Sequence, residues 1–381
     1  MAVLTLGVSG AAAVAARLQG NIDRVDVSAL VSPVPTRSDA PAPHDPNAGS
    51  PVNVLVLGSD ERDGVNGEIG GVVKGMRSDT TMVMHISADR TRVSVVSIPR
   101  DSLVDIPRCT MTNGTTTRAT RDMINAAFAM GWDKGGDMAS AAACTINTVQ
   151  QNTGVAIDHF AVVDFAGFQQ MVQALGGVPL CIPVPMKDDL SGLDIPKAGL
   201  QTLDGPTALA YARTRYSIGD GSDINRIGNQ QQLVAALVRE VLSRDVLTNP
   251  TKLMPFLSAA TSSLTTDSRL SLADMTGLAY QLRDIDRRNV TFMTIPWAPA
   301  RSNKDRVEWT PAAAQIWSDM ANDVPPTTYS PPAPTPSGTP VGTAGSAPAT
   351  AAPPAPAATL AQTKKAGKEE FSVADTTSVC S

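Results

Sequence analysis

The chain has 381 residues, of which 42% are hydrophobic and 4% are aromatic, and its formal net charge is −5 at pH 7. The length fits one large domain or two ordinary ones, and the hydrophobic content is sufficient for a sizeable core. A net negative charge argues against a general binder of nucleic acids or anionic membranes, so any arginine cluster is interpreted as a local site.

The N-terminal segment is apolar from Ala2 to Ala16, and a proline-rich stretch follows it. The apolar run is shorter than the roughly 20 residues of a membrane-spanning helix, and it lacks the basic start of a signal peptide. It fits an ordinary alanine-rich helix or, as we favour because of the spacer, the remnant of an N-terminal membrane anchor over residues 1–20. Residues 21–51 are then expected to form a proline-rich linker.

Three short runs rich in β-branched residues follow, each bounded by turn-forming residues. They are predicted to form buried strands at 52–58, 80–87 and 92–99. The short connection between the second and third runs favours an antiparallel pair. If the first pair is antiparallel too, the end of the first strand, the start of the second and the end of the third share one edge of the sheet.

Polar side chains stand at all three of these places: Asp60, Arg77, Asp79 and Arg100. Two carboxylates at one edge repel each other unless they share a proton or bind a cation. Mg²⁺ is held through one or two carboxylates plus substrate phosphates, which suits Asp60 and Asp79. Two alternatives stay open, namely an acid/base pair for glycoside hydrolysis and aspartates that only form turns.

The rest of the chain up to residue 325 alternates predicted helices and strands. Helices are expected at 122–130, 136–152, 166–177 and 203–212, and strands at 158–165, 178–184 and 289–296. The prolines of segment 178–184 indicate a strand at a sheet edge. A last helix is expected to begin at Pro311 with Thr310 as its N-cap.

This alternation predicts an α/β fold, a three-layer α/β/α domain on a central mixed β-sheet flanked by helices. The domain is expected to span residues 52–325. Residues 326–381 are rich in proline and alanine, and most of them carry no charge. They are expected to form a disordered tail, because they hold too little apolar surface to bury.

A second polar group surrounds the start of a long predicted helix, in the stretch RTRYSIGDGSDINRIGNQQQ. Its candidate residues are Arg213, Arg215, Asp223, Arg226 and Gln230. Gln230 falls within the apolar stripe of the helix, and Asp223 and Arg226 lie at the edge of that stripe. A helix N-terminus with arginines favours a phosphate, because guanidinium groups bind it bidentately.

The alternative is that these arginines only pair with surface carboxylates. We favour the oxyanion site, because burying several arginines without an anionic partner is costly. The chain contains no P-loop and no G-x-G-x-x-G motif, so a nucleoside triphosphate is not indicated. The pattern predicts a strongly anionic ligand, most simply a pyrophosphate with Mg²⁺.

Four cysteines occur, at positions 109, 144, 181 and 380, and none belongs to a C-x-x-C pair. They fit either small buried apolar residues or, in an extracytoplasmic protein, a disulfide. If a disulfide forms, Cys109 and Cys144 are the expected pair.

Successive segments of the chain resemble the motifs of the LytR-CpsA-Psr family of bacterial cell-wall enzymes. The segments that carry the resemblance include NVLVLGSDER, RSDTTMVMHI, VSIPRDSLVDIP, LDGPTALAYARTRY and DINRIGNQQQ. They appear in order over about residues 52–242. The resemblance implies a membrane-anchored, extracytoplasmic phosphotransferase that moves a glycopolymer phosphate from a polyprenyl-pyrophosphate carrier onto peptidoglycan, using Mg²⁺ with Mn²⁺ as a substitute.

The resemblance also implies roles for the candidate residues. Asp60 and Asp79 would hold the metal and act in catalysis together with Arg100 and Arg215. The pyrophosphate would be bound by Arg77, Arg100, Arg213, Arg215, Arg226 and Gln230, with Asp223 positioning the arginines. The alanine-rich composition and the cysteine pair resemble actinobacterial members, which suggests arabinogalactan or a related polymer as cargo.

Two other functions compete with this expectation. A hydrolase could cleave polyprenyl pyrophosphate in the same pocket with water as the acceptor. A non-enzymatic envelope attenuator protein could bind the anionic lipid without turnover, but it would not require two metal-binding carboxylates. No nucleic-acid partner is expected.

Overall fold

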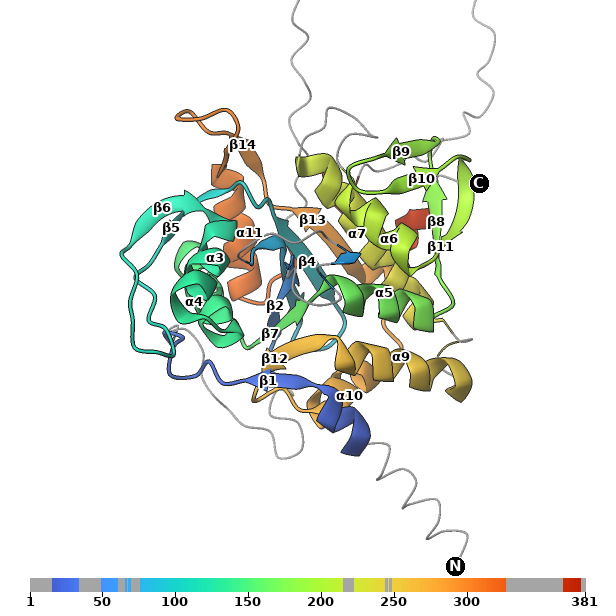
Figure 1. Cartoon of the computed structure of the whole chain (residues 1–381), viewed down its shortest axis with the longest axis horizontal. Coiled ribbons are helices and arrows are strands. Elements are labelled where there is room, and N and C mark those ends of the chain that lie inside the picture. The colour runs from blue at the N-terminus through green and yellow to red at the C-terminus, as the bar shows by residue number, and fades with distance from the viewer. Residues whose placement is uncertain are drawn as a thin grey trace, which may run out of the picture.

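The computed structural model describes residues 16–33, 49–60, 66, 68–69, 76–214, 223–243, 246, 249–326 and 366–377. At its centre lies an eight-stranded mixed sheet with the strand order β1-β12-β7-β2-β3-β4-β13-β16 (Figure 1). Its strands are Asp23–Val25 (β1), Val52–Ser59 (β2), Ser78–Ile86 (β3), Val93–Ile98 (β4), His159–Val163 (β7), Leu264–Asp267 (β12), Val290–Thr294 (β13) and Phe371–Ser372 (β16).

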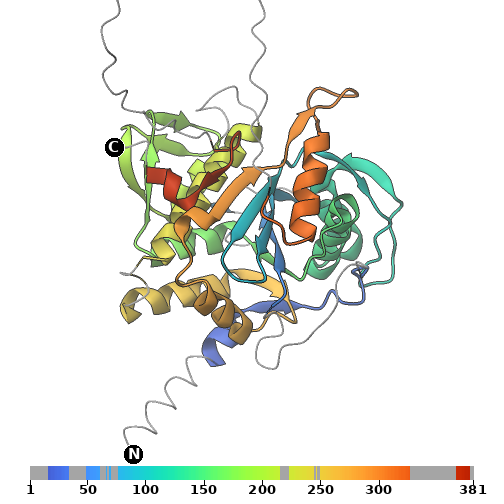
Figure 2. The same ribbon diagram turned by 180° about the vertical axis from the view of Figure 1, so that it is seen from behind.

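Helices cover both faces of this sheet, which confirms the predicted three-layer α/β/α class (Figures 1 and 2). One face packs against α3 (Ile124–Gly135), α4 (Met138–Thr153) and α11 (Pro311–Ala321). The other is covered by α5 (Phe165–Ala174), α6 (Gly205–Arg213), α7 (Asp223–Val241) and α10 (Leu272–Gln281), and α9 (Pro250–Ser262) packs against α5.

The central strands read as continuous apolar runs because both of their faces are buried. Successive residues of a strand point to opposite faces. Leu55 and Leu57 of β2 therefore pack in the core beneath α3 and α4, whereas Val54 packs in the core that includes α7. Asp204 and Gly154 fit the predicted helix ends, since Asp204 caps α6 and Gly154 ends α4 with φ 70°.

Short strand pairs outside the central sheet complete the fold. They are β5 (Leu103–Ile106) with β6 (Thr120–Met123), β8 (Val178–Ile182) with β11 (Gly199–Leu203), β9 (Met186–Asp188) with β10 (Leu193–Ile195), and β14 (Trp297–Pro299) with β15 (Val307–Trp309). The prediction of an edge strand in segment 178–184 is confirmed, because β8 pairs with β11 at the edge of a separate two-stranded sheet. Its prolines exclude it from the interior of the central sheet.

The predicted domain boundaries are wrong at both ends. Strand β1 lies within the expected linker and pairs in parallel with β12, so that Asp23 lies opposite Thr265. Strand β16 lies within the expected tail and pairs with β13. Each of these strands has only two or three residues and no periodic pattern of apolar residues. They form through pairing with distant strands, so the local sequence does not predict them.

The predicted membrane anchor falls mostly outside the described residues, which begin with a helical turn at 16–21. Among the residues that the structure describes, no helix combines the length and the apolar character needed to cross a bilayer.

The expected disulfide between Cys109 and Cys144 is present, with a Cα–Cα distance of 5.3 Å. It joins the segment after β5 to the buried middle of α4. Cys181 is disulfide-bonded as well, and Cys380 lies outside the described residues.

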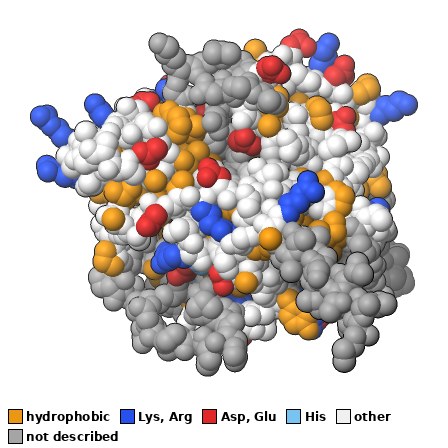
Figure 3. All heavy atoms as spheres, turned by 60° about the horizontal axis from the view of Figure 1, so that its bottom comes forward, with side chains coloured by type: hydrophobic (Ala, Val, Ile, Leu, Met, Phe, Trp, Pro, Cys, Tyr) orange, Lys and Arg blue, Asp and Glu red, His pale blue; other side chains and the backbone are white. Residues whose placement is uncertain are grey.

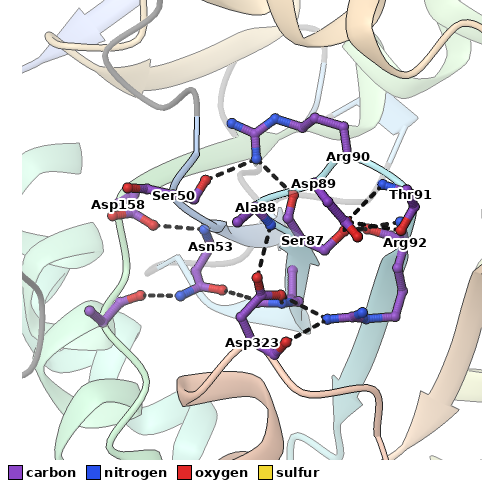
Figure 4. Close-up of polar contacts among 12 residues, drawn as sticks. Ser50, Asn53, Ser87, Ala88, Asp89, Arg90, Thr91, Arg92, Asp158 and Asp323 are labelled. Atoms are coloured by element: carbon purple, nitrogen blue, oxygen red, sulfur yellow. Dashed lines mark hydrogen bonds and ion pairs between the residues drawn. The ribbon is translucent and has the colours of Figure 1, made fainter. Parts of the chain in front are cut away.

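A polar cluster joins the end of α11 to the opposite end of the sheet from the predicted site (Figure 4). The Oδ1 atom of Asp323 accepts a hydrogen bond from Arg92 Nη2 at 2.7 Å and lies 3.0 Å from His85 Nε2. His85 is buried, and its Nδ1 lies 2.7 Å from Asn53 Oδ1. Both ring nitrogens of His85 therefore lie within hydrogen-bond distance of a side-chain oxygen, which fixes the orientation of the ring.

We expect Asp323→Asn to lower the free energy of unfolding by about 1–3 kcal/mol, because it removes the charge that faces Arg92 and His85. Asparagine tolerates the positive φ of 55° at this position, so backbone strain does not contribute. Denaturant unfolding measures the change. Asp284→Asn is the control, because Asp284 is 82% exposed and pairs with Arg283 at the surface. Equal stabilities of the two variants would contradict the role of the cluster.

Candidate functional site

Strands β2, β3 and β4 bring their polar termini to one edge of the sheet, as predicted. β2 pairs antiparallel with β3, and β3 pairs antiparallel with β4. A β-bulge interrupts the first pair between Gly58 and Ser59, just before Asp60. A bulge bends the strand and redirects the side chains that follow it, which is why bulges occur beside binding sites.

Asp60 fixes the start of β3 through two contacts with the backbone of Arg77. The Asp60 N–H donates to Arg77 O at 2.9 Å, and Asp60 Oδ1 accepts from Arg77 N–H at 2.6 Å. Asp60 is 8% exposed, whereas the side chain of Arg77 lies at the surface. Asp60 therefore anchors the segment that carries Asp79.

Two carboxylates and two guanidinium groups form a closed ring between the sheet and α7. Arg100 Nη1 lies 2.8 Å from Asp79 Oδ1, and Arg100 Nε lies 3.4 Å from Asp223 Oδ1. Arg226 Nη2 lies 2.5 Å from Asp223 Oδ1 and donates to the backbone carbonyl of Asp79 at 3.2 Å. We call Asp79, Arg100, Asp223 and Arg226 the acid–arginine ring.

The acid–arginine ring holds its charges although it is largely buried. Arg226 is only 4% exposed. Burial opposes the charged form of Arg100, but the nearby carboxylates of Asp79 and Asp223 outweigh it and raise the pKa of Arg100. The guanidinium groups are therefore charged and fixed in position before any anion binds.

Arg213 and Gln230 extend this polar edge toward α6. The guanidinium carbon of Arg213 lies 4.8 Å from the centre of the Phe165 ring, a cation–π contact. Gln230 Nε2 donates to the carbonyl of Ala212 at 3.3 Å. Both side chains line the same cavity as Asp79 and Arg226.

The three successive glutamines of α7 contact three different neighbours. Gln230 bonds to α6, and Gln232 Oε1 accepts from the hydroxyl of buried Tyr211 at 2.8 Å. Gln231 is completely buried and donates to Ser97 Oγ at 2.9 Å. Side chains one residue apart on a helix point in different directions. The glutamine run therefore joins α7 to α6 on one side and to the sheet on the other.

An apolar cavity of about 360 Å³ opens from the polar edge between the sheet and helices α5, α6 and α7. Its polar lining includes Asp79 from the start of β3, Arg213 from the end of α6, and Arg226 and Gln230 from the first turns of α7. Its interior is lined by large apolar side chains, among them Met82, Phe165, Phe168, Met171, Leu233 and Leu237. The site therefore joins a fixed set of guanidinium groups to an apolar chamber.

The structure thus brings most of the predicted residues together. Asp60, Asp79, Arg100, Arg213, Asp223, Arg226 and Gln230 converge at one edge of the sheet. Arg77 contributes its backbone to this edge, through its hydrogen bond to Asp60. Arg215 lies outside the described residues. The apolar stripe predicted for α7 consists of Ile227, Val234, Leu237, Val238 and Val241, and of these Val234 and Leu237 line the cavity. The contribution of α5 was missed, because Phe165, Phe168 and Met171 have the spacing of an ordinary core face.

The carboxylates at this edge fit a cation that has few protein ligands. Among the described ranges, no group of three or more His, Cys, Asp or Glu side chains is placed to hold a metal. Asp60 follows the last residue of β2, and Asp79 is the second residue of the adjacent strand β3. This placement suits Mg²⁺ whose coordination is completed by phosphate oxygens. The two aspartates are therefore compatible with a metal that binds together with its anionic substrate.

Charge is otherwise mixed on the face of the molecule that Figure 3 shows. Basic and acidic side chains alternate there among apolar and neutral ones, without a continuous basic area among the described residues of that face. The arginines of the site thus form a local feature, as the net charge of −5 indicated.

Comparisons with known proteins agree on one family. The LytR_cpsA_psr family model matches residues 21–321. Cell wall biosynthesis protein LcpA of Corynebacterium glutamicum is 33% identical over 266 residues, which cover 65% of this chain and 50% of LcpA. Probable cell wall biosynthesis protein LcpB of the same species is 37% identical over 221 residues, 56% of this chain and 47% of LcpB. The chain thus spans about half the length of these two relatives.

A teichoic acid transferase, TagU of Enterococcus faecalis, is 31% identical over 62% of this chain and 67% of TagU. Among solved structures, TagT bound to LI-WTA superposes with a TM-score of 0.56 at 22% identity, covering 79% of this chain and 99% of TagT. A LytR-Csp2A-Psr enzyme from Actinomyces oris superposes with a TM-score of 0.54 at 22% identity, covering 79% of this chain and 96% of the other. At these identities the structural likeness shows the fold alone.

We expect Arg100→Lys to weaken the binding of inorganic pyrophosphate by about tenfold or more, although the charge is kept. A lysine ammonium cannot bridge Asp79 and Asp223 with separate nitrogens, as the guanidinium group does. Calorimetric titration measures the affinity, with the unfolding midpoint as the test of folding. Arg121→Lys is the control, because Arg121 is 53% exposed at the surface. An unchanged affinity in Arg100→Lys would contradict the bridging role.

Proposed function

The chain belongs to the LytR-CpsA-Psr family, and on that premise we propose that it is a phosphotransferase that moves a glycopolymer phosphate from a polyprenyl-pyrophosphate carrier onto peptidoglycan. The observation that carries the proposal is that arginines held by carboxylates lie next to an apolar cavity. A polyprenyl pyrophosphate has the same two parts, a charged bridge and an apolar chain. The cavity volume of about 360 Å³ lies within the range of small-ligand pockets, about 300–1,000 Å³.

The arrangement of the site also fixes the orientation of such a carrier. Arg213, Arg226 and Gln230 lie at the polar end of the cavity, whereas large apolar side chains line most of the rest. Placing the isoprenoid chain at the polar end would remove these polar groups from water without offering them a hydrogen bond, which is costly. The chain therefore lies inside the cavity, and the glycan extends outward from the edge of the sheet.

In the proposed transfer, a hydroxyl of peptidoglycan attacks the phosphorus that carries the glycan. A new P–O bond forms, the bridging P–O bond breaks, and polyprenyl phosphate leaves while the hydroxyl loses its proton. The arginines stabilise the charge that develops on the departing phosphate. Because they are held by Asp79 and Asp223, they do not have to reorganise when that charge appears.

We further propose that Asp60 and Asp79 hold Mg²⁺, or Mn²⁺ as a substitute. Among the described side chains of the site, Arg100, Arg213 and Arg226 are matched in charge by the three aspartates Asp60, Asp79 and Asp223, so they leave no net positive charge to balance a pyrophosphate bridge. A divalent cation would supply the missing charge and neutralise the bridging oxygens. Asp60 also holds the start of β3, so the same side chain would set the position of Asp79.

The relatives support this function by their names. TagU of E. faecalis is a polyisoprenyl-teichoic acid–peptidoglycan teichoic acid transferase, and LcpA and LcpB are cell wall biosynthesis proteins of an actinobacterium. We propose arabinogalactan or a related polymer as the cargo here. We also propose an extracytoplasmic site of action with a single-pass N-terminal anchor, which the Cys109–Cys144 disulfide supports because such bonds persist in oxidising compartments.

Transfer is tested with a polyprenyl-pyrophosphate-linked glycan and peptidoglycan fragments, followed by product mass. We expect Arg226→Ala to lose at least about a hundredfold in turnover, because it removes a buried stabiliser of the transition state. Arg121→Ala, a change at the exposed surface, should retain activity. Release of free glycan phosphate without attachment to peptidoglycan would identify a pyrophosphatase instead. Binding without any product would identify an attenuator.

The metal is tested separately. Asp60→Asn and Asp79→Asn should bind the lipid carrier within about tenfold of the unaltered protein but lose most turnover, because an amide cannot neutralise a cation. A chelator should inactivate the unaltered protein, and Mg²⁺ or Mn²⁺ should restore it. Full turnover in the presence of the chelator would remove the metal role. Normal turnover of both variants would place the site elsewhere.

A further inference from the structure

The residues after the proline- and alanine-rich stretch return to the folded domain. Residues 366–377, here called the C-terminal clamp, lie against β13 and α7 (red in Figure 2). Within the clamp, β16 pairs antiparallel with β13 and places Phe371 opposite Phe292. The two rings are stacked with their centres 5.4 Å apart, and Val373 is completely buried. The clamp is therefore packed into the domain as a structural part of it.

The clamp contacts α7 through a buried glutamine. The N–H of Gly367 donates to Gln231 Oε1 at 2.9 Å. The amide nitrogen of the same glutamine donates to Ser97 on β4 at 2.9 Å and to Thr294 on β13 at 3.2 Å. Gln231 thus joins the clamp, the helix and two strands of the sheet through one side chain.

Two glycines allow the clamp to approach the helix closely. A Cβ atom at Gly228 would lie 2.5 Å from the carbonyl oxygen of Ala366, which is closer than real Cβ contacts. Gly367 has φ 83°, and a Cβ atom there would lie 2.6 Å from the carbonyl oxygen of Ile224. Backbone therefore meets backbone along the first turns of α7.

The same turns carry the site on their other side. Arg226 and Gln230 line the cavity, whereas Gly228 and Gln231 contact the clamp. Asp223, which holds both arginines of the acid–arginine ring, is the first residue of this helix. A shift of these turns would move Asp223 and Arg226 together relative to Arg100 on the sheet.

We propose that the C-terminal clamp is a positioning element, which holds the first turns of α7 against the sheet and so sets the geometry of the acid–arginine ring. Gly228 and Gln231 are its positioning residues. This inference depends on the proposed function only for experiments that measure turnover. The binding of pyrophosphate and the contact itself are tested independently of that function.

Gly228→Ala separates the clamp from the helix. Alanine favours a helix over glycine, so α7 itself is not weakened, but the added methyl group displaces Ala366. We expect faster amide hydrogen exchange over 366–377 and a loss of inorganic pyrophosphate affinity of about three- to thirtyfold. Gly277→Ala is the matched control, because Gly277 lies in helix α10 with open space around its Cβ position. It should change neither quantity.

A second variant releases the clamp from the other end. Phe371→Ala removes the ring that stacks on Phe292 and should cause the same loss of affinity, whereas Phe371→Leu should retain most of it. Combining Phe371→Ala with Gly228→Ala should add little, because both changes release one element. The unfolding midpoint of each variant is measured in parallel. If the contact were purely structural, Gly228→Ala would lower the midpoint, and the folded protein would bind pyrophosphate with unchanged affinity.

The outcomes separate the two proposals. Faster exchange in the clamp with unchanged pyrophosphate affinity would overturn the positioning role and leave the phosphotransferase proposal intact. Unchanged exchange in Gly228→Ala would overturn the contact itself. Weakened pyrophosphate binding in both clamp variants, with no transfer by any protein including the unaltered one, would support the clamp and reject the phosphotransferase.

Discussion

The acid–arginine ring is the interaction on which the rest of the structure depends. Asp79 comes from the start of β3, Arg100 from the turn after β4, and Asp223 and Arg226 from the first turn of α7. Buried charges are tolerated only when each has a partner, so these segments cannot separate without leaving a charge unpaired. The antiparallel pairing of β2, β3 and β4, the bulge after Gly58 and the direction of α7 are all arrangements that deliver these side chains to one place.

Helix α7 divides its inward surface between two tasks along its length. Its first turns present Asp223, Arg226 and Gln230, and its later turns present Leu233 and Leu237 to the apolar cavity. A helix rises about 1.5 Å per residue, so the two parts are separated by a fixed distance that no side-chain rotation alters. The sequence of this one helix thus sets where the polar part of the site ends and the apolar part of the cavity begins. A shift of the N-terminal turns of α7 would therefore displace the polar part.

Much of this site could be predicted from the sequence because it depends on local signals. The short connection between β3 and β4 favoured an antiparallel pair, and polar residues next to the three β-branched runs identified Asp60, Asp79 and Arg100 as candidates. The cavity could not be found in this way, since Phe168 and Met171 have the spacing of a core face, and only the packing of α5 shows that a chamber lies beside them. Strands β1 and β16 were missed because they have no pattern of their own and exist only through pairing with distant strands.

Strands β1 and β16 occupy the two outer positions of the central sheet, so segments near either end of the described chain form its edge strands. During synthesis, β13 emerges well before Phe371 and Ser372 are available to pair with it. Its unpaired N–H and C=O groups are exposed in that interval, and such an edge can recruit another chain. The proline- and alanine-rich stretch between the two strands thus lengthens the interval during synthesis in which this edge of β13 lacks its partner.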